Sequence, residues 1–177
     1  MRLKIPMREF QNKTYWIVGA SEGLGRALAI QLAKVGTKVI ISARSEERLI
    51  GLSEEIGSNT MVLPMDVSDR SSVQKAFSKL PKSLDGFIFV SGVYWHMSAS
   101  SWDETKAEEM VDVNLVGAMR CLAHLIPKFI NQGFGHIVLT GSIAGYRGLP
   151  GSVGYCASKA GLMSLAETLK IDLAKNK

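Results

Sequence analysis

A chain of 177 residues is long enough to form one domain with a sizeable buried core. Hydrophobic residues make up 46% of it and charged residues 21%, a profile that is typical of a soluble globular protein and excludes global disorder. The net charge of +5 fits an anionic ligand or a mildly basic surface, but the basic residues form no stripe with interleaved aromatic residues, so a nucleic-acid partner is not expected.

Apolar, β-branched runs alternate with helical patterns along the chain. Strands are predicted at Tyr15–Val18, Lys38–Ser42, Thr60–Pro64, Gly86–Val90 and His136–Thr140. Helices are predicted at Gly23–Lys34, Glu46–Ile56, Ser71–Leu80, Trp102–Gln132 and from Ser152 to the end. This alternation predicts a parallel sheet with helices on both faces.

Local signals refine these elements. Asp69 and Ser71 are suited to the N-cap region of the third helix. Pro127 lies inside the long fourth helical pattern and is expected to kink or break it, because proline lacks a backbone donor. No repeat, low-complexity tract or Pro/Gly-rich linker divides the chain, so we expect a single domain over residues 1–177.

Cysteine and histidine usage indicates neither a metal centre nor disulfides. Cys121 and Cys156 match no metal-ligand spacing and no disulfide framework, which is typical of a reducing compartment. The three histidines lie far apart in the sequence, so no metal site is expected. The first ten residues lack the continuous apolar core of a secretory signal. No apolar run looks long enough to span a bilayer. We therefore expect a cytoplasmic protein without a membrane contact.

Tyr155 and Lys159, in Y-C-A-S-K, lie four residues apart in a helical pattern, so both side chains point from one helix face. A nearby ammonium group favours the phenolate and lowers the pKa of a phenol from its usual value near ~10. Such a tyrosine can exchange a proton with a substrate oxygen near neutral pH. The same spacing is common on solvated helix faces, so its interpretation depends on the motifs that accompany it.

The segment V-G-A-S-E-G-L-G at 18–25 follows the first strand and begins the first helix. Glycine lets the backbone turn sharply and approach a ligand closely, and a helix N-terminus offers free N–H groups to a pyrophosphate. The spacing is G-x-x-x-G-x-G rather than the G-x-G-x-x-G of many dehydrogenases. The strand–turn–helix context favours dinucleotide binding over a tight turn that serves only helix–strand packing.

The end of the second strand bears on the choice of cofactor. Ala43 and Arg44 stand about 20 residues past the glycines, where an acidic residue would bind a free ribose 2′-hydroxyl. An arginine pairs instead with a 2′-phosphate, so NADP(H) is favoured over NAD(H). Glu22 argues against this choice because its carboxylate repels a phosphate, and the alternative for Arg44 is an ordinary surface charge.

Together these motifs resemble the short-chain dehydrogenase/reductase family, in its single-domain branch, from about Lys13 to Lys177. The resemblance implies an α/β, Rossmann-like, doubly wound parallel sheet in three α/β/α layers, with about five strands in the order 3-2-1-4-5. It also implies an oxidoreductase that transfers a hydride between NADP(H) and a small-molecule carbonyl or alcohol substrate.

The resemblance also assigns roles to single residues. Asp66, with Val67 beside it, matches the aspartate that binds the adenine amino group, and Ser91 and Gly92 stand where relatives have N-A-G against the adenosine ribose. Asn114 matches the helix asparagine whose backbone carbonyl holds a water in a proton relay. The alternatives are a helix cap for Asp66 and a helix-interior hydrogen-bonding residue for Asn114.

The expected catalytic centre follows from the same resemblance. Ser142 matches the serine that hydrogen-bonds the substrate oxygen, although a simple turn residue is the alternative. Tyr155 matches the proton donor or acceptor, and Lys159 the residue that lowers its pKa and holds the nicotinamide ribose. The expected catalytic residues are Asn114, Ser142, Tyr155 and Lys159. The expected cofactor contacts are Gly19, Ser21, Glu22, Gly23, Leu24, Gly25, Arg44, Asp66, Val67, Ser91, Gly92, Tyr155 and Lys159.

Several features depart from the family pattern. Val18 stands where relatives have a threonine, and Ser91 stands where they have an asparagine. Glu22 is unusual for a loop that binds NADP. Relatives continue past the Tyr155 helix with further strands, so we expect a sheet that lacks them, an exposed apolar edge at 136–140 and a nicotinamide site open to water. Two functions stay open: an NADP-dependent enzyme, or a non-catalytic dinucleotide-binding or interaction module.

Partners follow only in outline. In relatives the long fourth helix and the Tyr155 helix build a dimer interface, so a homodimer or homotetramer is expected. The loop Val93–Ser101 carries Tyr94, Trp95 and Met97, which indicate an apolar or aromatic-compatible substrate pocket or, alternatively, packing against the core.

Overall fold

Five parallel strands form the centre of the computed structural model, which describes residues 8–174. The strands are β1 (Thr14–Val18), β2 (Lys38–Ser42), β3 (Thr60–Val62), β4 (Gly86–Phe89) and β5 (Ile137–Leu139). Their order in the sheet is β3-β2-β1-β4-β5, which confirms the predicted fold class and strand order. The basic residues before position 8 and the last three residues of the predicted final helix lie outside the described part of the chain.

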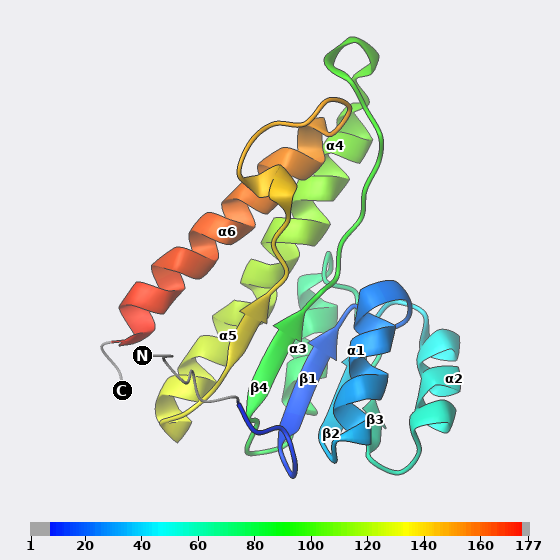
Figure 1. Ribbon diagram of the computed structural model, residues 1–177, viewed down its shortest axis with the longest axis vertical. Helices are drawn as coiled ribbons and strands as arrows, with labels where there is room; N and C mark the ends of the chain where they lie inside the picture. The colour runs from blue at the N-terminus through cyan, green and yellow to red at the C-terminus, as the bar shows by residue number, and fades with distance from the viewer. Residues whose placement is uncertain (1–7, 175–177) are drawn as a thin grey trace, which may run out of the picture.

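Helices cover both faces of the sheet (Figure 1). They are α1 (Gly23–Lys34), α2 (Glu46–Ile56), α3 (Arg70–Ser78), α4 (Glu104–Val111), α5 (Gly117–Gln132) and α6 (Val153–Ala174). Shorter turns are the 3₁₀ segments η1 (Ala99–Ser101) and η3 (Ile143–Gly145) and the π-helical segment η2 (Asp112–Val116). The α1 and α2 helices pack on one face, and α3, α5 and α6 pack on the other.

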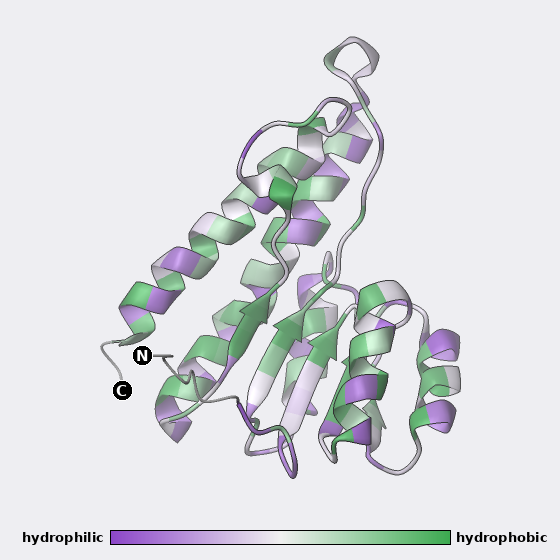
Figure 2. Cartoon of the chain, viewed as in Figure 1, coloured by the Kyte–Doolittle hydropathy of each residue, from purple (hydrophilic) through white to green (hydrophobic). Residues whose placement is uncertain are grey.

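Side chains along β1 alternate between the two hydrophobic clusters, one on each face of the sheet. Trp16 and Val18 point into the cluster shared with α3 and α5, whereas Tyr15 and Ile17 point into the cluster shared with α1 and α2. All four are at most 1% exposed, so β1 is buried on both faces, as expected for a central parallel strand. Figure 2 shows β5 in hydrophobic green along its length, which matches the apolar pattern that predicted it.

Pro127 was expected to kink or break the fourth helix, and a break at Pro127 is not present. Helix α5 runs through Pro127 to Gln132, because its flanking residues Leu125 and Phe129 are buried in the core and hold the backbone in place. The interruption lies earlier, where Asp112–Val116 forms a π-helical turn between α4 and α5. Such turns often occur at functional sites.

The expectation that no apolar run is long enough to span a bilayer also needs correction. The continuous helical stretch Glu104–Gln132 is long and apolar enough to do so by length and composition. Its apolar residues have another explanation, because Leu122, Leu125 and Phe129 are buried against the sheet. A core helix passes the same test.

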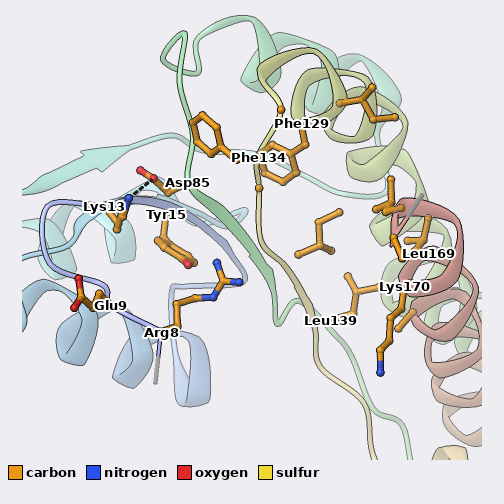
Figure 3. A pocket seen from close by; sticks show the side chains of 17 residues that line it. Arg8, Glu9, Lys13, Tyr15, Asp85, Phe129, Phe134, Leu139, Leu169 and Lys170 are labelled. Atoms are coloured by element: carbon orange, nitrogen blue, oxygen red, sulfur yellow. Dashed lines mark ion pairs between the residues drawn. The ribbon is translucent and has the colours of Figure 1, made fainter. Parts of the chain in front are cut away.

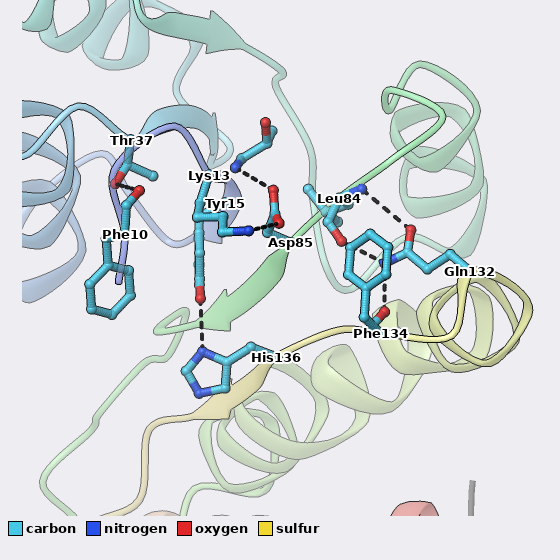
Figure 4. A network of polar contacts seen from close by, with 10 residues as sticks. Phe10, Lys13, Tyr15, Thr37, Leu84, Asp85, Gln132, Phe134 and His136 are labelled. Carbon is cyan, nitrogen blue, oxygen red and sulfur yellow. Dashed lines mark hydrogen bonds and ion pairs between the residues drawn. The ribbon is translucent and has the colours of Figure 1, made fainter. Parts of the chain in front are cut away.

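A polar network ties the strands together at their amino ends (Figure 4). Asp85, just before β4, accepts a hydrogen bond from Thr14 N at 2.8 Å and pairs with Lys13 Nζ at 3.2 Å. Tyr15 Oη lies 3.0 Å from His136 Nδ1 at the start of β5. Burial lowers the pKa of His136. The network thus joins β1, β4 and β5 at their amino ends, whereas ligands of open α/β sheets bind at the carboxyl ends of the strands.

Candidate active site

The glycine turn between β1 and α1 is packed so closely that side chains are excluded. Gly19 has φ +97°, and a Cβ there would lie 2.5 Å from the backbone nitrogen of Ser91. A Cβ at Gly25 would overlap the carbonyl oxygen of Gly19. Gly23 differs, because at φ +54° it needs its conformational freedom but has open space around it. The turn thus packs directly against the residues that follow β4, at the two glycines where a side chain would not fit.

A cleft of about 280 Å³ opens beside this turn at the carboxyl ends of β1, β2 and β4. The structure brings together there all the predicted adenosine-side contacts except Gly23, namely Gly19, Ser21, Glu22, Leu24, Gly25, Arg44, Asp66, Val67, Ser91 and Gly92. The glycine cradle, the free N-terminus of α1 and the exposed cation Arg44 fit a phosphorylated dinucleotide. Tyr155 and Lys159 do not line this cleft.

Asp66 is held on one side only. Its Oδ1 accepts hydrogen bonds from Ser68 N at 2.9 Å and from Ser68 Oγ at 2.5 Å. No hydrogen bond to Oδ2 is present among residues 8–174. The alternative of a helix cap does not hold for Asp66, because α3 begins after Asp69, whose Oδ1 accepts from Ser71 N at 2.8 Å. The N-cap prediction for Asp69 is thereby confirmed.

Asn114 lies fully buried in the π-helical turn and uses its side chain as a clamp. Its Oδ1 accepts from Val93 N at 2.7 Å, and its Nδ2 donates to Val93 O at 3.0 Å and to Ser158 Oγ at 3.1 Å. Ser158 Oγ donates in turn to Tyr155 O at 2.8 Å. The amide therefore joins the loop after β4 to the Tyr155 helix. Gly92 must stay small, since a Cβ there would lie 3.1 Å from Asn114 Oδ1.

Lys159 is the most buried charged group of the site, with only 5% of the residue exposed. Its Nζ lies 5.6 Å from the centroid of the Tyr155 ring, so the two residues share a helix face as the spacing predicted. The same Nζ donates a hydrogen bond to Thr140 O at 2.8 Å, which ties α6 to the end of β5. Burial lowers the pKa of Lys159 from its ordinary value of 10.5.

Ser142 lies on a turn that rests against the same helix. Its Oγ accepts from Ala144 N at 3.2 Å, so the turn-residue role is present. A Cβ on Gly145 would lie 3.0 Å from Lys159 O, and one on Gly141 would lie 3.2 Å from Met163 Cγ. Two small residues thus let the Ser142 turn approach α6 closely, one helical turn from Tyr155.

The residues of the loop after β4 differ in burial, since one packs in the core and two are exposed. Met97 is 2% exposed and packs with Ala107 and Met110, so it belongs to the core. Tyr94 and Trp95 are 48% and 40% exposed. The Tyr94 ring meets the Tyr155 ring edge-on, with centroids 5.2 Å apart. Tyr94 therefore contacts the predicted catalytic tyrosine directly.

A larger cavity of about 750 Å³ lies elsewhere, along the free edge of β5 (Figure 3). Its walls are mostly apolar and include Phe129, Phe134, Leu139 and Leu169. Within residues 8–174, strand β5 pairs only with β4, so the predicted open edge is present in this part of the chain. Neither Tyr155 nor Lys159 lines this cavity, and size alone does not make it the reaction site.

Sequence reasoning missed several residues of the site. Arg48 lines the dinucleotide cleft and pairs with Glu22. The backbone carbonyl of Thr140 accepts a hydrogen bond from Lys159, and the hydroxyl of Ser158 accepts one from Asn114. Arg48 stands one helical turn after Arg44, which is the only local signal for it. No group of three or more His, Cys, Asp or Glu able to hold a metal occurs among residues 8–174.

A family model described as short chain dehydrogenase matches residues 13–177. The chain belongs to this family of oxidoreductases. It is 33% identical to an uncharacterised oxidoreductase of Listeria monocytogenes, over 93% of this chain and 69% of that protein. It is also 33% identical to a 3-oxoacyl-[acyl-carrier-protein] reductase of Aquifex aeolicus, over 94% of this chain and 70% of that one.

Solved structures agree with this assignment. The closed form of a serine dehydrogenase complexed with NADP⁺ superposes with a TM-score of 0.87 at 27% identity, covering 90% of this chain and 66% of that chain. A short chain dehydrogenase/reductase family protein superposes with a TM-score of 0.89 at 27% identity, over 96% of this chain and 72% of that chain. The short-chain dehydrogenase therefore spans about two thirds of the length of these family members.

Proposed function

We propose that this short-chain dehydrogenase transfers a hydride between NADP(H) and the carbonyl or alcohol carbon of a small molecule, with Tyr155 exchanging the proton on the substrate oxygen. The arrangement of Lys159 carries this proposal. A buried ammonium lies 5.6 Å from the Tyr155 ring and donates to Thr140 O at 2.8 Å, and burying a charge merely to join α6 to β5 would cost more than an apolar contact. Lys159 thus places a positive charge beside the tyrosine that is proposed to exchange the proton.

The other catalytic roles follow from what each side chain has left to offer. Ser142 accepts one hydrogen bond and keeps its hydroxyl proton for a substrate oxygen. The side-chain amide of Asn114 is engaged with Val93 and Ser158, so only its backbone carbonyl, in the π-helical turn, is proposed to hold a relay water. Lys159 is proposed to hold the nicotinamide ribose as well. NADP(H), when bound, supplies or accepts the hydride.

A preference for NADP(H) is part of the proposal. Arg44 lines the cleft, is exposed, and has no ion-pair partner among residues 8–174. A free guanidinium at the end of β2 suits a 2′-phosphate better than a 2′-hydroxyl. The serine dehydrogenase to which this chain is similar is itself complexed with NADP⁺.

A second function rests on the openness of the catalytic half. Ile143 and Tyr146, which flank the Ser142 turn, are 76% and 80% exposed. An open site excludes water poorly and weakens the electrostatic stabilisation of the reacting groups. This observation favours the alternative that the chain is a non-catalytic dinucleotide-binding or interaction module derived from such an enzyme.

Oxidation of NADPH by a panel of aldehydes, ketones and β-keto thioesters, followed by absorbance, separates the two functions. The enzyme proposal predicts turnover with at least one compound that is lost in Tyr155→Phe while NADPH still binds. Tyr146→Phe is the matched control, because Tyr146 lies on the neighbouring exposed turn. NADPH binding without turnover for any compound favours the module instead.

We also propose that the chain forms a homodimer or homotetramer through α5 and α6, and that it is cytoplasmic. Met119 and Ile130 on α5 and Ile171 on α6 are 49%, 46% and 64% exposed, which is consistent with an apolar contact on these helices. Light scattering tests the assembly, and a clean monomer at micromolar concentration argues against it.

A further inference from the structure

Glu22 and Arg48 meet across the mouth of the dinucleotide cleft. Arg48 Nη1 lies 2.6 Å from Glu22 Oε2, and both residues line the cleft together with Arg44. Glu22 is the N-cap residue of α1, yet its side chain caps no backbone N–H of that helix. Its carboxylate is instead committed to an arginine that comes from the start of α2.

The backbone of Arg48 is fixed while its guanidinium is not. Arg48 is the third residue of α2, and its N–H donates to the N-cap Ser45 Oγ at 3.4 Å. The side chains of Arg48 and Glu22 are 59% and 75% exposed. Exposed ion pairs of this kind are weak, so exchanging one partner for another costs little.

The charges around the cleft set the consequence. A carboxylate at Glu22 repels a bound phosphate, but an Arg48 that pairs with it offsets part of that charge. Two more carboxylates, Glu46 and Glu47, lie in the first turn of α2, and Arg44 alone among the neighbouring cations lacks a partner within residues 8–174. A second cation at the cleft, beside these carboxylates, would strengthen discrimination in favour of a phosphate.

We propose that Arg48 is a second specificity residue for the 2′-phosphate of NADP(H). In the free chain Arg48 pairs with the Glu22 carboxylate, and in the complex the 2′-phosphate replaces that carboxylate as the partner of Arg48. This inference rests on the proposed use of NADP(H) and adds to it an exchange of ion-pair partners. The charge of Glu22 alone argues against NADP(H). In this proposal Glu22 instead orients Arg48, which recognises the 2′-phosphate. It follows that Glu22 competes with the phosphate and limits the affinity.

The test uses adenosine 2′,5′-bisphosphate and 5′-AMP as probes in calorimetric titrations, since these ligands address only the adenosine half of the cleft. Arg48→Ala is expected to weaken bisphosphate binding about tenfold, the effect of one charge-assisted contact, and 5′-AMP binding by less than about twofold. Arg26→Ala is the matched control, because Arg26 pairs with Glu55 between the same two helices but does not line the cleft. It is expected to leave both affinities unchanged.

The role of Glu22 has its own signature. Glu22→Gln is expected to tighten bisphosphate binding about threefold when Arg48 is present and to have a smaller effect in the Arg48→Ala background. Arg48→Gln, checked by thermal unfolding, serves as a second variant if the alanine substitution disturbs α2. Equal gains in both backgrounds overturn the exchange of partners.

The outcomes also separate this inference from the proposed function. If both probes bind but Arg48→Ala affects them equally, the inference fails and the dinucleotide site stands. If 5′-AMP and the bisphosphate bind equally well to the unmodified chain, the preference for a 2′-phosphate fails with it. If neither probe binds, the dinucleotide cleft itself is disproved, and the inference falls together with the proposed function.

Discussion

The Lys159 ammonium faces the Tyr155 ring from 5.6 Å while it donates a hydrogen bond to Thr140 O. One buried cation thus connects the helix that carries the tyrosine with the strand that precedes Ser142. Because an unpaired buried charge is costly, its position is fixed by the single carbonyl and by any ligand that enters the site. This relationship makes the catalytic half of the molecule open to several direct tests.

Tyr155→Phe is expected to lower kcat by at least about 100-fold, the contribution typical of a general acid or base. The substitution removes one hydroxyl, and no hydrogen bond to that hydroxyl is present among residues 8–174, so the unfolding temperature is expected to change little. Steady-state kinetics and thermal unfolding measure the two effects. Equal loss in the Tyr146→Phe control would point to a general disturbance of the site.

Lys159→Met is expected to abolish turnover and also to change how stability depends on pH. Burial holds the pKa of Lys159 below 10.5, so between that lowered value and 10.5 the unfolded chain binds more protons than the folded one. The free energy of unfolding of the native chain should therefore rise with pH in this window, relative to Lys159→Met. Denaturant unfolding at a series of pH values measures it.

Lys170→Met is the control for that experiment, since Lys170 lies on the same helix but is exposed. It should leave the pH dependence as it is in the native chain. A parallel course for the native chain and Lys159→Met up to pH 10.5 would show that burial of this ammonium has no energetic consequence.

Gly19→Ala is expected to destabilise the chain by about 2–4 kcal/mol and to abolish dinucleotide binding. The new Cβ would lie 2.5 Å from Ser91 N, and the residue would keep a positive φ. Gly23→Ala is the matched control, because Gly23 also has a positive φ but has open space around it. It should cost about 1 kcal/mol. Similar losses in both variants would mean that strain, rather than the close approach to β4, limits the turn.

Asn114→Ala is expected to cost about 3 kcal/mol, because it leaves the N–H and the carbonyl of Val93 without their partner in a buried site. Ser158→Ala removes only one member of the same network and should cost less. Chemical denaturation of both variants measures the difference. A smaller loss for Asn114→Ala than for Ser158→Ala would contradict the clamp.

The two thiols are expected to differ in reactivity. Burial raises the pKa of Cys121 to about 12, so almost no thiolate forms at neutral pH. Cys156 is only partly buried and adjoins Tyr155. A disulfide reagent should therefore label one thiol in the native chain and two after denaturation. Native labelling of both would show that the core around Cys121 opens readily.

The alternation of apolar runs with helical patterns predicted a parallel sheet, and the family resemblance supplied the strand order that the structure shows. The strand ends were less so: β3 and β5 are three residues long instead of the predicted five. In the described part of the chain both are edge strands with one hydrogen-bonded neighbour. That neighbour, rather than the apolar pattern, sets how far the ladder extends.

Some features of the site were also predictable from the sequence and others were not. The glycine spacing predicted the tight turn at Gly19 and Gly25, and the helical period predicted that Tyr155 and Lys159 share a helix face. The pairing of Glu22 with Arg48 joins residues 26 positions apart through the fold, and the π-helical turn at Asp112–Val116 lies within an unbroken helical pattern. Neither leaves a local signal, so tertiary packing alone reveals them.

Calorimetric titration of the 177-residue chain with NADPH and NADH is the most direct test of the dinucleotide site. We expect saturable binding of NADPH with a Kd on the order of micromolar, at least about tenfold weaker binding of NADH, and loss of this difference in Arg44→Ala. If neither cofactor binds, the cleft beside the glycine turn is not a dinucleotide site.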